Sequence, residues 1–198
     1  MQTQVKQVTP EEYLELERKA DFRSEYRNGE IVEMTGGTID HNRIAGNVYA
    51  FLKYALRGKG AEPFFGDLRL WIPDYQLYTY PDVMVIQGTP IFLDDQRDTV
   101  TNPCLIVEVL SKSTQGYDCS DKFKMYRSVP QFQEYVLINQ YQVEIEHHTK
   151  TSEGWLLRDY GADAQSIQLR TLREAELPLE IEWAIADLYE GVTFESES

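Results

Sequence analysis

The run Cys104-Leu105-Ile106-Val107-Glu108-Val109-Leu110 is typical of a buried β-strand, yet it carries a carboxylate in its middle. Burying an ionised carboxylate costs several kcal/mol unless a cation, a metal or hydrogen bonds compensate it. Because side chains alternate along a strand, Glu108 shares one face with Ile106 and Leu110. We therefore expect Glu108 to be used by the protein and to have a partner on that face.

Asp82 begins a second short apolar run, residues 83–86, directly after Tyr80-Pro81. Proline fixes its own φ and favours an extended residue before it, so this strand starts in a defined direction. If the two strands are neighbours, Asp82 and Glu108 converge on one side of the sheet. Two carboxylates with a carbonyl and waters suit Mg²⁺ or Mn²⁺, which can activate water for attack on a phosphodiester. The alternative is that Asp82 only begins a strand after a turn.

A short helix is expected over residues 121–129, and it carries two lysines. At ~100° per residue, Lys122 shares the direction of the apolar side chains, whereas Lys124 lies nearly opposite. The apolar side chains around the direction of Lys122 are Phe123, Met125, Tyr126 and Val129. An inward lysine needs an anion, and Glu108 lies on the strand that leads to this helix. We expect Lys122 to orient or help deprotonate the attacking water, or to stabilise charge on the phosphate.

Two other interpretations remain open from these residues. Glu108 and Lys122 could form a buried ion pair with a purely structural role. Lys112, which follows the Glu108 strand directly, is a rival for the lysine role, although its turn-rich surroundings are more typical of a solvated lysine.

The rest of the chain predicts a mixed α/β fold, in which a mixed sheet is flanked by helices. We expect residues 1–198 to form a single domain with a frayed tail at 195–198. Thr9-Pro10-Glu11-Glu12 is a capping box that starts a helix, and Asn28-Gly29 is a hairpin turn. The expected helices are 10–19, 40–56 and 121–129, and the expected strands are 22–26, 30–34, 62–72, 82–87, 104–110, 134–138, 142–148, 155–160 and 166–169.

Composition limits the class of protein. The chain has 198 residues and a formal net charge of -14, which argues against broad electrostatic attraction to nucleic acid. Acidic metal ligands contribute to that charge, so a metal-dependent nuclease stays possible. No run approaches the roughly 20 apolar residues of a membrane span, and a cytoplasmic protein is expected.

Several motifs resemble the Uma family of bacterial restriction-endonuclease-like proteins, and they occur in order along nearly the whole chain. The matching segments are Phe22-Arg23-Ser24-Glu25-Tyr26, Gly29-Glu30-Ile31-Val32, His41, Tyr80-Pro81-Asp82-Val83, Ile106-Val107-Glu108-Val109-Leu110-Ser111, Tyr117-Asp118, Asp121-Lys122-Phe123, Tyr126-Arg127 and Glu134-Tyr135-Val136. The resemblance implies the restriction-endonuclease-like fold of the PD-(D/E)XK superfamily. It also implies a metal-dependent nuclease site at Asp82, Glu108 and Lys122.

The chain departs from the commonest superfamily pattern at one position. That pattern has a lysine two residues after the acid, where this chain has Leu110. The lysine would have migrated to the helix as Lys122, in agreement with the helical-face argument.

Three further residues carried by the resemblance are candidates for accessory roles. Glu25 is either a further metal-side carboxylate or a strand glutamate paired with an arginine. His41 is either a capping or core residue of its helix or a catalytic one. Asp118 either fixes the loop before the Lys122 helix or assists the site by contacting the residues that bind the metal, without binding the metal itself.

The function predicted from the sequence is a Mg²⁺- or Mn²⁺-dependent endonuclease that hydrolyses DNA. A homodimer is expected, because cleavage of two strands commonly uses two sites. The alternatives are an inactive interaction or regulatory module on the same fold, or a metal-dependent hydrolase of RNA or nucleotides.

Overall fold

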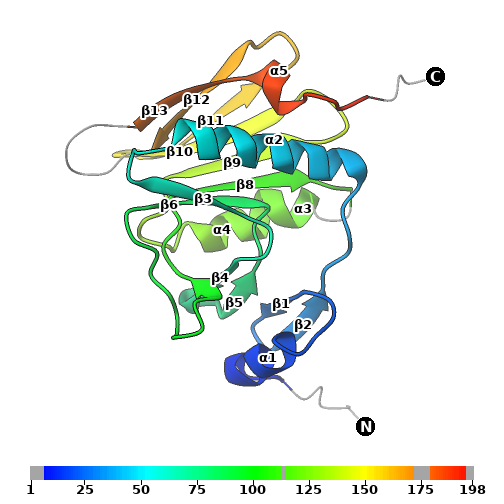
Figure 1. The fold of residues 1–198 in the computed structure, drawn as a ribbon, viewed down its shortest axis with the longest axis vertical. Coiled ribbons are helices and arrows are strands. Elements are labelled where there is room, and N and C mark those ends of the chain that lie inside the picture. The colour runs from blue at the N-terminus through cyan, green and yellow to red at the C-terminus, as the bar shows by residue number, and fades with distance from the viewer. Residues whose placement is uncertain (1–6, 113–114, 172–178, 195–198) are drawn as a thin grey trace.

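A six-stranded mixed sheet forms the centre of the computed structural model, which describes residues 7–112, 115–171 and 179–194 (Figure 1). The strand order is β11-β10-β9-β8-β6-β3, with β8 and β9 parallel and the other neighbours antiparallel. The strands are β3 (Ala61–Phe65), β6 (Val83–Gln87), β8 (Leu105–Leu110), β9 (Glu134–Asn139), β10 (Ile145–Thr151) and β11 (Gly154–Tyr160). The prediction of a mixed α/β fold is confirmed.

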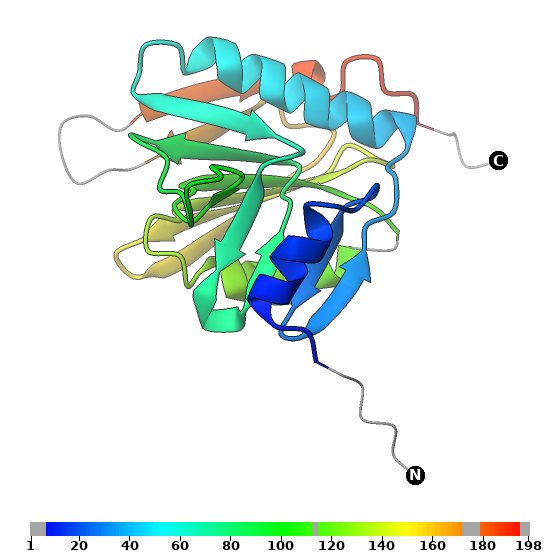
Figure 2. The ribbon, with the colours of Figure 1, turned by 60° about the horizontal axis from the view of Figure 1, so that its bottom comes forward.

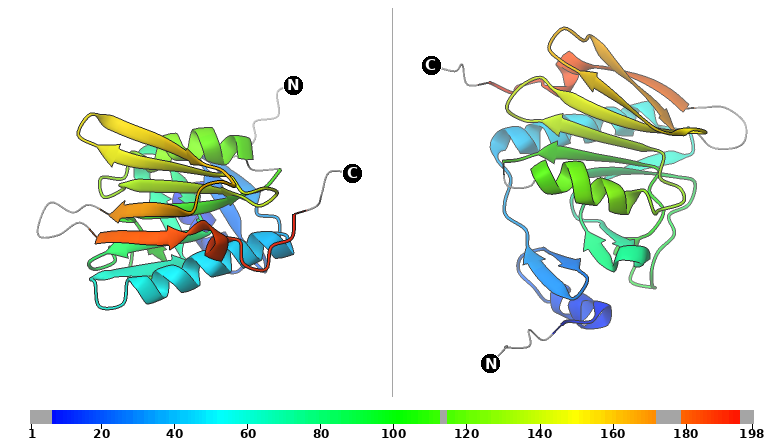
Figure 3. Two further views of the ribbon diagram at one scale, coloured as in Figure 1. Left: turned by 90° about the horizontal axis from the view of Figure 1, so that it is seen from above. Right: turned by 180° about the vertical axis from the view of Figure 1, so that it is seen from behind.

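One face of this sheet is covered by α2 (Ile39–Ala55) and by a C-terminal hairpin (Figure 3). The helix buries a stripe of apolar side chains at helical spacing against the sheet, namely Ile44, Ala45, Val48 and Leu52. The hairpin consists of β12 (Ser166–Thr171) and β13 (Leu179–Ala184), and α5 (Ile185–Leu188) follows it. Because both faces of β8 are covered, its sequence is an almost continuous apolar run.

The opposite face carries a short helical segment made of three parts. It begins with α3 (Gln115–Tyr117), continues as a π-helical turn η2 (Asp118–Lys122) and ends with α4 (Phe123–Tyr126). An aromatic cluster of Tyr126, Phe132 and Tyr135 packs beneath it. This face also carries the Glu108 side chain, since Ile106 and Leu110, which alternate with it on the same side of β8, pack in the hydrophobic core that contains these aromatic rings.

A second sheet lies at the N-terminal end of the molecule, with strand order β2-β1-β5-β4-β7 (Figure 2). Its strands are β1 (Ser24–Arg27), β2 (Glu30–Glu33), β4 (Arg69–Ile72), β5 (Leu77–Thr79) and β7 (Thr99–Val100), and α1 (Pro10–Glu17) packs on it. The predicted capping box is present at Thr9 and Glu12. The predicted hairpin turn is also confirmed, since Asn28 and Gly29 both adopt positive φ.

Two predictions from the sequence are corrected by the structure. The single strand expected over 62–72 is two strands, β3 and β4, in different sheets, because the chain turns at Gly66 with φ +70. Residues 88–103, where no helix or strand is expected, contain β7, which pairs parallel with β4 beside the ion pair Arg69–Asp98 at 3.0 Å. Both errors concern pairing between distant segments, which periodicity does not report.

The helix expected over 121–129 begins earlier than predicted, at Gln115. Its π-helical turn, Asp118–Lys122, lies before the residues used in the helical-face argument, so the α-helical spacing from Lys122 onwards is kept. Among the described residues, no helix is long and apolar enough to cross a membrane. The predicted frayed tail, 195–198, lies outside the described residues.

Candidate functional site

Asp82 and Glu108 lie side by side at the point where β6 begins. Val83 pairs with Val107 across the antiparallel β6–β8 ladder, which places Asp82 next to Glu108. The Asp82 amide donates to Glu108 Oε2 at 3.2 Å, and the Val109 amide donates to Asp82 Oδ2 at 2.8 Å. Each carboxylate is thus held by a backbone N–H beside the other. The two side chains therefore lie close together on neighbouring strands, as the sequence predicted.

Lys122 faces three carboxylates at once. Its Nζ lies 3.0 Å from Glu108 Oε1, 3.1 Å from Asp118 Oδ1 and 3.4 Å from Glu25 Oε1. The contact with Glu108 is a hydrogen bond, and the contacts with Asp118 and Glu25 are ion pairs. All four side chains are buried, whereas Lys124 is exposed, as the helical-face argument predicted.

The π-helical turn explains how one short segment supplies two of these groups. Asp118 and Lys122 are four residues apart on η2, and both side chains point into the molecule. Tyr135 of β9 fixes the start of the turn, since its hydroxyl donates to the Asp118 carbonyl at 3.1 Å. π-Helical turns are frequent at functional sites because they realign side chains within a helix.

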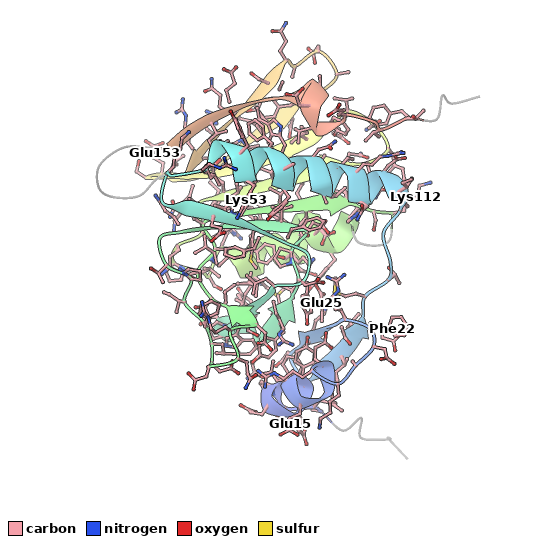
Figure 4. All side chains as sticks on the ribbon, viewed as in Figure 1. Glu15, Phe22, Glu25, Lys53, Lys112 and Glu153 are labelled. Atoms are coloured by element: carbon pink, nitrogen blue, oxygen red, sulfur yellow. The ribbon has the colours of Figure 1, made fainter. Side chains whose placement is uncertain are left out.

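Glu25 reaches the site from the N-terminal sheet. It lies between the β1–β2 hairpin and the six-stranded sheet (Figure 4), and it accepts hydrogen bonds from the Thr79 hydroxyl and from Arg27 Nε, the latter at 2.9 Å. The Arg27 guanidinium in turn stacks over the Tyr117 ring, 3.8 Å from its centroid. Glu25 therefore combines both interpretations left open by the sequence: it pairs with an arginine and it faces Lys122.

His41 and Asp82 are the two partly exposed side chains of the site, and we call this pair the open edge. His41 Nε2 is 3.2 Å from Asp82 Oδ2, and these two side chains are 20% and 22% exposed while the other acidic groups of the site are buried. The His41 amide is capped by Thr38, which is the N-cap of α2. The helix start thus brings His41 to Asp82.

Burial and charge control the protonation of the central groups. Burial raises the pKa of Glu108 to about 8, which Asp82 and Asp118 favour and Lys122 opposes. Burial alone would lower the pKa of Lys122, but Glu108, Glu25 and Asp118 outweigh it and raise that pKa well above its ordinary value. Lys122 therefore favours its charged form, which suits it to stabilise negative charge.

The same balance acts on the two groups at the sides of the site. Burial would raise the pKa of Glu25, but Lys122, the Thr79 hydroxyl and Arg27 together lower it. Burial would lower the pKa of His41, but the hydrogen bond and the charge of Asp82 raise it. Four carboxylates (Glu25, Asp82, Glu108 and Asp118) thus share the site with the two permanent cations Lys122 and Arg27.

This donor set fits a hard divalent cation. Carboxylate oxygens are the ligands that Mg²⁺ and Mn²⁺ prefer, and two carboxylates commonly suffice when waters and substrate oxygens complete the shell. A cation of charge two would also compensate the excess of carboxylates over cations. Within the described ranges, no three Asp, Glu, His or Cys side chains form a preassembled metal cage, so Asp82 and Glu108 are the pair best placed to hold such an ion.

Tyr126 is a site residue to which the sequence argument assigned no role. Its hydroxyl donates to Glu108 Oε1 at 2.7 Å, so that oxygen is held by both Tyr126 and Lys122. The signal was present, since the helical projection places Tyr126 in the direction of Lys122. The rival Lys112 lies away from this cluster, with its Nζ 5.2 Å above the Tyr141 ring.

Comparison with known proteins shows the family to which the chain belongs. The model of the Uma2 family, described as "Putative restriction endonuclease", matches residues 10–180. The chain belongs to the Uma2 family. Two relatives from Synechocystis sp., the proteins sll1609 and slr1290, are 40% and 34% identical over 167 and 190 residues. These alignments cover 84% and 94% of this chain, and 94% of each relative.

A solved structure shares the fold of this Uma2 protein. The crystal structure of "a putative nuclease belonging to DUF820" from Anabaena variabilis superposes with a TM-score of 0.71 at 17% identity. The match covers 94% of this chain and 99% of that one. At this level of identity the likeness shows the fold, which is the one that the resemblance in the sequence implied.

Proposed function

We propose that this Uma2 protein is a metal-dependent endonuclease that hydrolyses DNA phosphodiester bonds. The observation that carries the proposal is the pair of backbone hydrogen bonds that fixes Asp82 beside Glu108. Lys122 Nζ lies 3.0 Å from Glu108 Oε1. A buried ion pair of purely structural use needs one acid and one base, whereas this site gathers four carboxylates. Such a concentration of carboxylates is costly unless a cation binds there or one of them is protonated, and the raised pKa of Glu108 reflects this cost in the metal-free site.

The residues take different roles in this proposal. Asp82 and Glu108 would hold Mg²⁺ or Mn²⁺, which when bound supplies an acidified water and neutralises charge on the phosphate oxygens. Lys122 remains protonated, so it orients the water and stabilises the negative charge that develops in the transition state. Tyr126 and Lys122 together hold Glu108 Oε1, which directs the other oxygen towards Asp82.

The accessory residues position these groups. Asp118 and Glu25 lie 3.1 and 3.4 Å from Lys122 Nζ and hold its ammonium group in place by charge. His41, at the open edge, orients Asp82 through Oδ2. Glu25 also couples the N-terminal sheet to the site, so displacement of that sheet would change the surroundings of Lys122.

The test is cleavage of supercoiled plasmid at low salt with Mg²⁺ or Mn²⁺. We expect nicking or linearisation by the wild type, and its loss in Glu108→Gln and Lys122→Ala. Lys124→Ala is the matched control, because Lys124 lies on the exposed side of the same helix. This variant should cleave the plasmid like the wild type. Cleavage that survives both site substitutions would show that the site lies elsewhere.

A second candidate is an inactive interaction module on the same fold, and the net charge of -14 favours it. Metal-dependent stabilisation separates the two. A working site should raise the melting temperature of the wild type when Mg²⁺ or Mn²⁺ is added, because a ligand that binds only the folded state stabilises it. Glu108→Gln should lose that response.

A further inference from the structure

We propose that β11 pairs antiparallel with the β11 of a second copy of this chain, so that two six-stranded sheets join into one. The inference goes beyond the proposed nuclease function and does not depend on it. Three features of β11 carry it: backbone groups that point away from the sheet, exposed leucines on both faces, and a register in which the strand fits its own copy.

β11 is one of the two edge strands of the six-stranded sheet and forms its outer margin (Figure 3). It pairs residue for residue with β10 and contains neither a proline nor a bulge. The other edge strand, β3, contains Pro63, which has no amide N–H to offer to a further strand. Proteins often protect an exposed edge with a proline or a bulge, so β11 is the edge that stays open to pairing.

The backbone groups of alternate β11 residues point away from β10. The Lys150 amide donates to the Gln133 carbonyl at 2.8 Å, so the backbone groups of Lys150 point towards β9. Opposite residues in an antiparallel ladder exchange two hydrogen bonds or none, and the two kinds of pair alternate. Because Trp155 lies opposite Lys150, the residues with outward backbone groups are Trp155, Leu157 and Asp159. In the part of the chain that the structure describes, no backbone group from outside β10 bonds to these three residues.

Exposed apolar side chains lie on both faces of this edge. Leu157 is 46% exposed and lies opposite His148, on the face that carries the α3–α4 segment. The His148 ring marks that face, since its centroid is 4.3 Å from that of Phe123. Leu156 is 42% exposed on the other face, because neighbouring side chains of a strand alternate. A strand placed beside β11 would cover both leucines, and burial of apolar surface favours that contact.

The sequence of β11 fits its own copy when a two-fold axis passes through Leu157. Such an axis, perpendicular to the sheet, pairs the strand with itself and keeps each face continuous. The two Leu157 residues then lie opposite each other, and Leu156 lies opposite Arg158. Trp155 lies opposite Asp159, so all of the outward backbone groups find partners.

The neighbouring registers place like charges opposite each other. An axis at Arg158 would bring two arginines together, and an axis at Leu156 would set Asp159 opposite Glu153. Like charges directly opposite in a sheet are destabilising. In the Leu157 register, the stem of Arg158 covers Leu156 of the second copy while its guanidinium group stays in water. Because each chain has a net charge of -14, the dimer should become tighter as added salt screens the repulsion.

The test is sedimentation velocity of the full chain over a range of concentrations. We expect the wild type to form a dimer of two 23.0 kDa chains. Leu157→Lys places like charges on the axis and should raise the dissociation constant at least about ten-fold. Leu157→Pro removes an N–H that points outwards, so it should give a monomer that circular dichroism shows to be folded. Tyr54→Lys is the matched control, because Tyr54 is 79% exposed on α2, and it should dimerise like the wild type.

A cysteine substitution tests the register. Opposite residues of a hydrogen-bonded antiparallel pair have Cα atoms about 5.5 Å apart, which suits a disulfide. Cys104 is buried and Cys119 is partly exposed, so Cys119→Ser is the background. In that background we expect Leu157→Cys to give a cross-linked dimer on oxidation with copper phenanthroline, and Tyr54→Cys to give none.

A wild type that stays monomeric at all concentrations, or a dimer that survives both Leu157→Lys and Leu157→Pro, would overturn the inference. A dimer that Leu157→Cys does not cross-link would overturn the register. These results are distinct from failure of the proposed function, which the plasmid assay measures. Dimerisation through β11 without metal-dependent cleavage would leave the interface and remove the nuclease, and cleavage by a monomeric wild type would do the reverse.

Discussion

Substituting Glu108 by glutamine should remove the loss of stability that this residue causes as the pH rises in the metal-free protein. Glu108 has a pKa of about 8 in the folded protein, against an ordinary value of 4.5. Between these values the folded state holds a proton that the unfolded state has released, so stability falls as the pH rises through this window. Since each pKa unit corresponds to about 1.4 kcal/mol, the loss for the wild type is on the order of a few kcal/mol.

Glutamine keeps the shape of the side chain and has no proton to lose. We therefore expect the two proteins to have similar stability at about pH 5 in EDTA, and Glu108→Gln to be more stable by a few kcal/mol at about pH 9. Urea unfolding at a series of pH values measures this difference. Comparing the two proteins at each pH removes the contributions of other titrating groups, such as His41.

Excess Mg²⁺ or Mn²⁺ supplies the second half of the experiment. A cation bound to the ionised site should restore about 2.7 kcal/mol to the wild type at a hundred times its Kd, and nothing to Glu108→Gln. Parallel pH dependence of wild type and variant in EDTA would refute the argument that Glu108 carries the uncompensated charge. An equal response of both to metal would refute the assignment of Glu108 as a ligand.

Three further predictions follow from individual contacts. Lys122→Arg should lower the cleavage rate by about a hundred-fold or more in the plasmid assay, because the planar guanidinium cannot meet three carboxylates as the ammonium does. Tyr126→Phe removes the 2.7 Å hydrogen bond to Glu108 and should cost about ten-fold in cleavage rate, with the melting temperature measured alongside to separate a positioning role from a loss of folding. Glu134→Ala removes the buried carboxylate 2.7 Å from His147 Nε2 and should cost about 1 to 3 kcal/mol in urea unfolding while the response to metal is retained.

Local signals in the sequence predicted the elements that depend on local chemistry. The capping box at Thr9 and the turn at Asn28-Gly29 are present, because each is a property of a few consecutive residues. The inward direction of Lys122 was also predictable, since it needs only the helical period. The early start of that helix was missed, because no rule of spacing signals a π-helical turn.

Pairing between distant segments was not predictable in the same way. The chain over 62–72 looks like one strand, yet it divides at Gly66 between two sheets. β7 lies in a stretch with weak strand character, and it pairs with β4 beside the ion pair between the buried Arg69 and the partly exposed Asp98. Strand propensity describes a fit to a half-buried surface, and which surface a segment meets is decided by the whole chain.

For the site, the sequence determined that Glu108 would be buried and need compensation, because a carboxylate in an apolar strand cannot be left alone. It also singled out Asp82 and Lys122 as the partners. Only the tertiary structure decided that Glu25 and Asp118 join them around one ammonium group, and that Tyr126 holds Glu108. These contacts join β1, β8 and the η2–α4 segment, and the free energy that brings such elements together comes from packing of the whole core rather than from any local pattern.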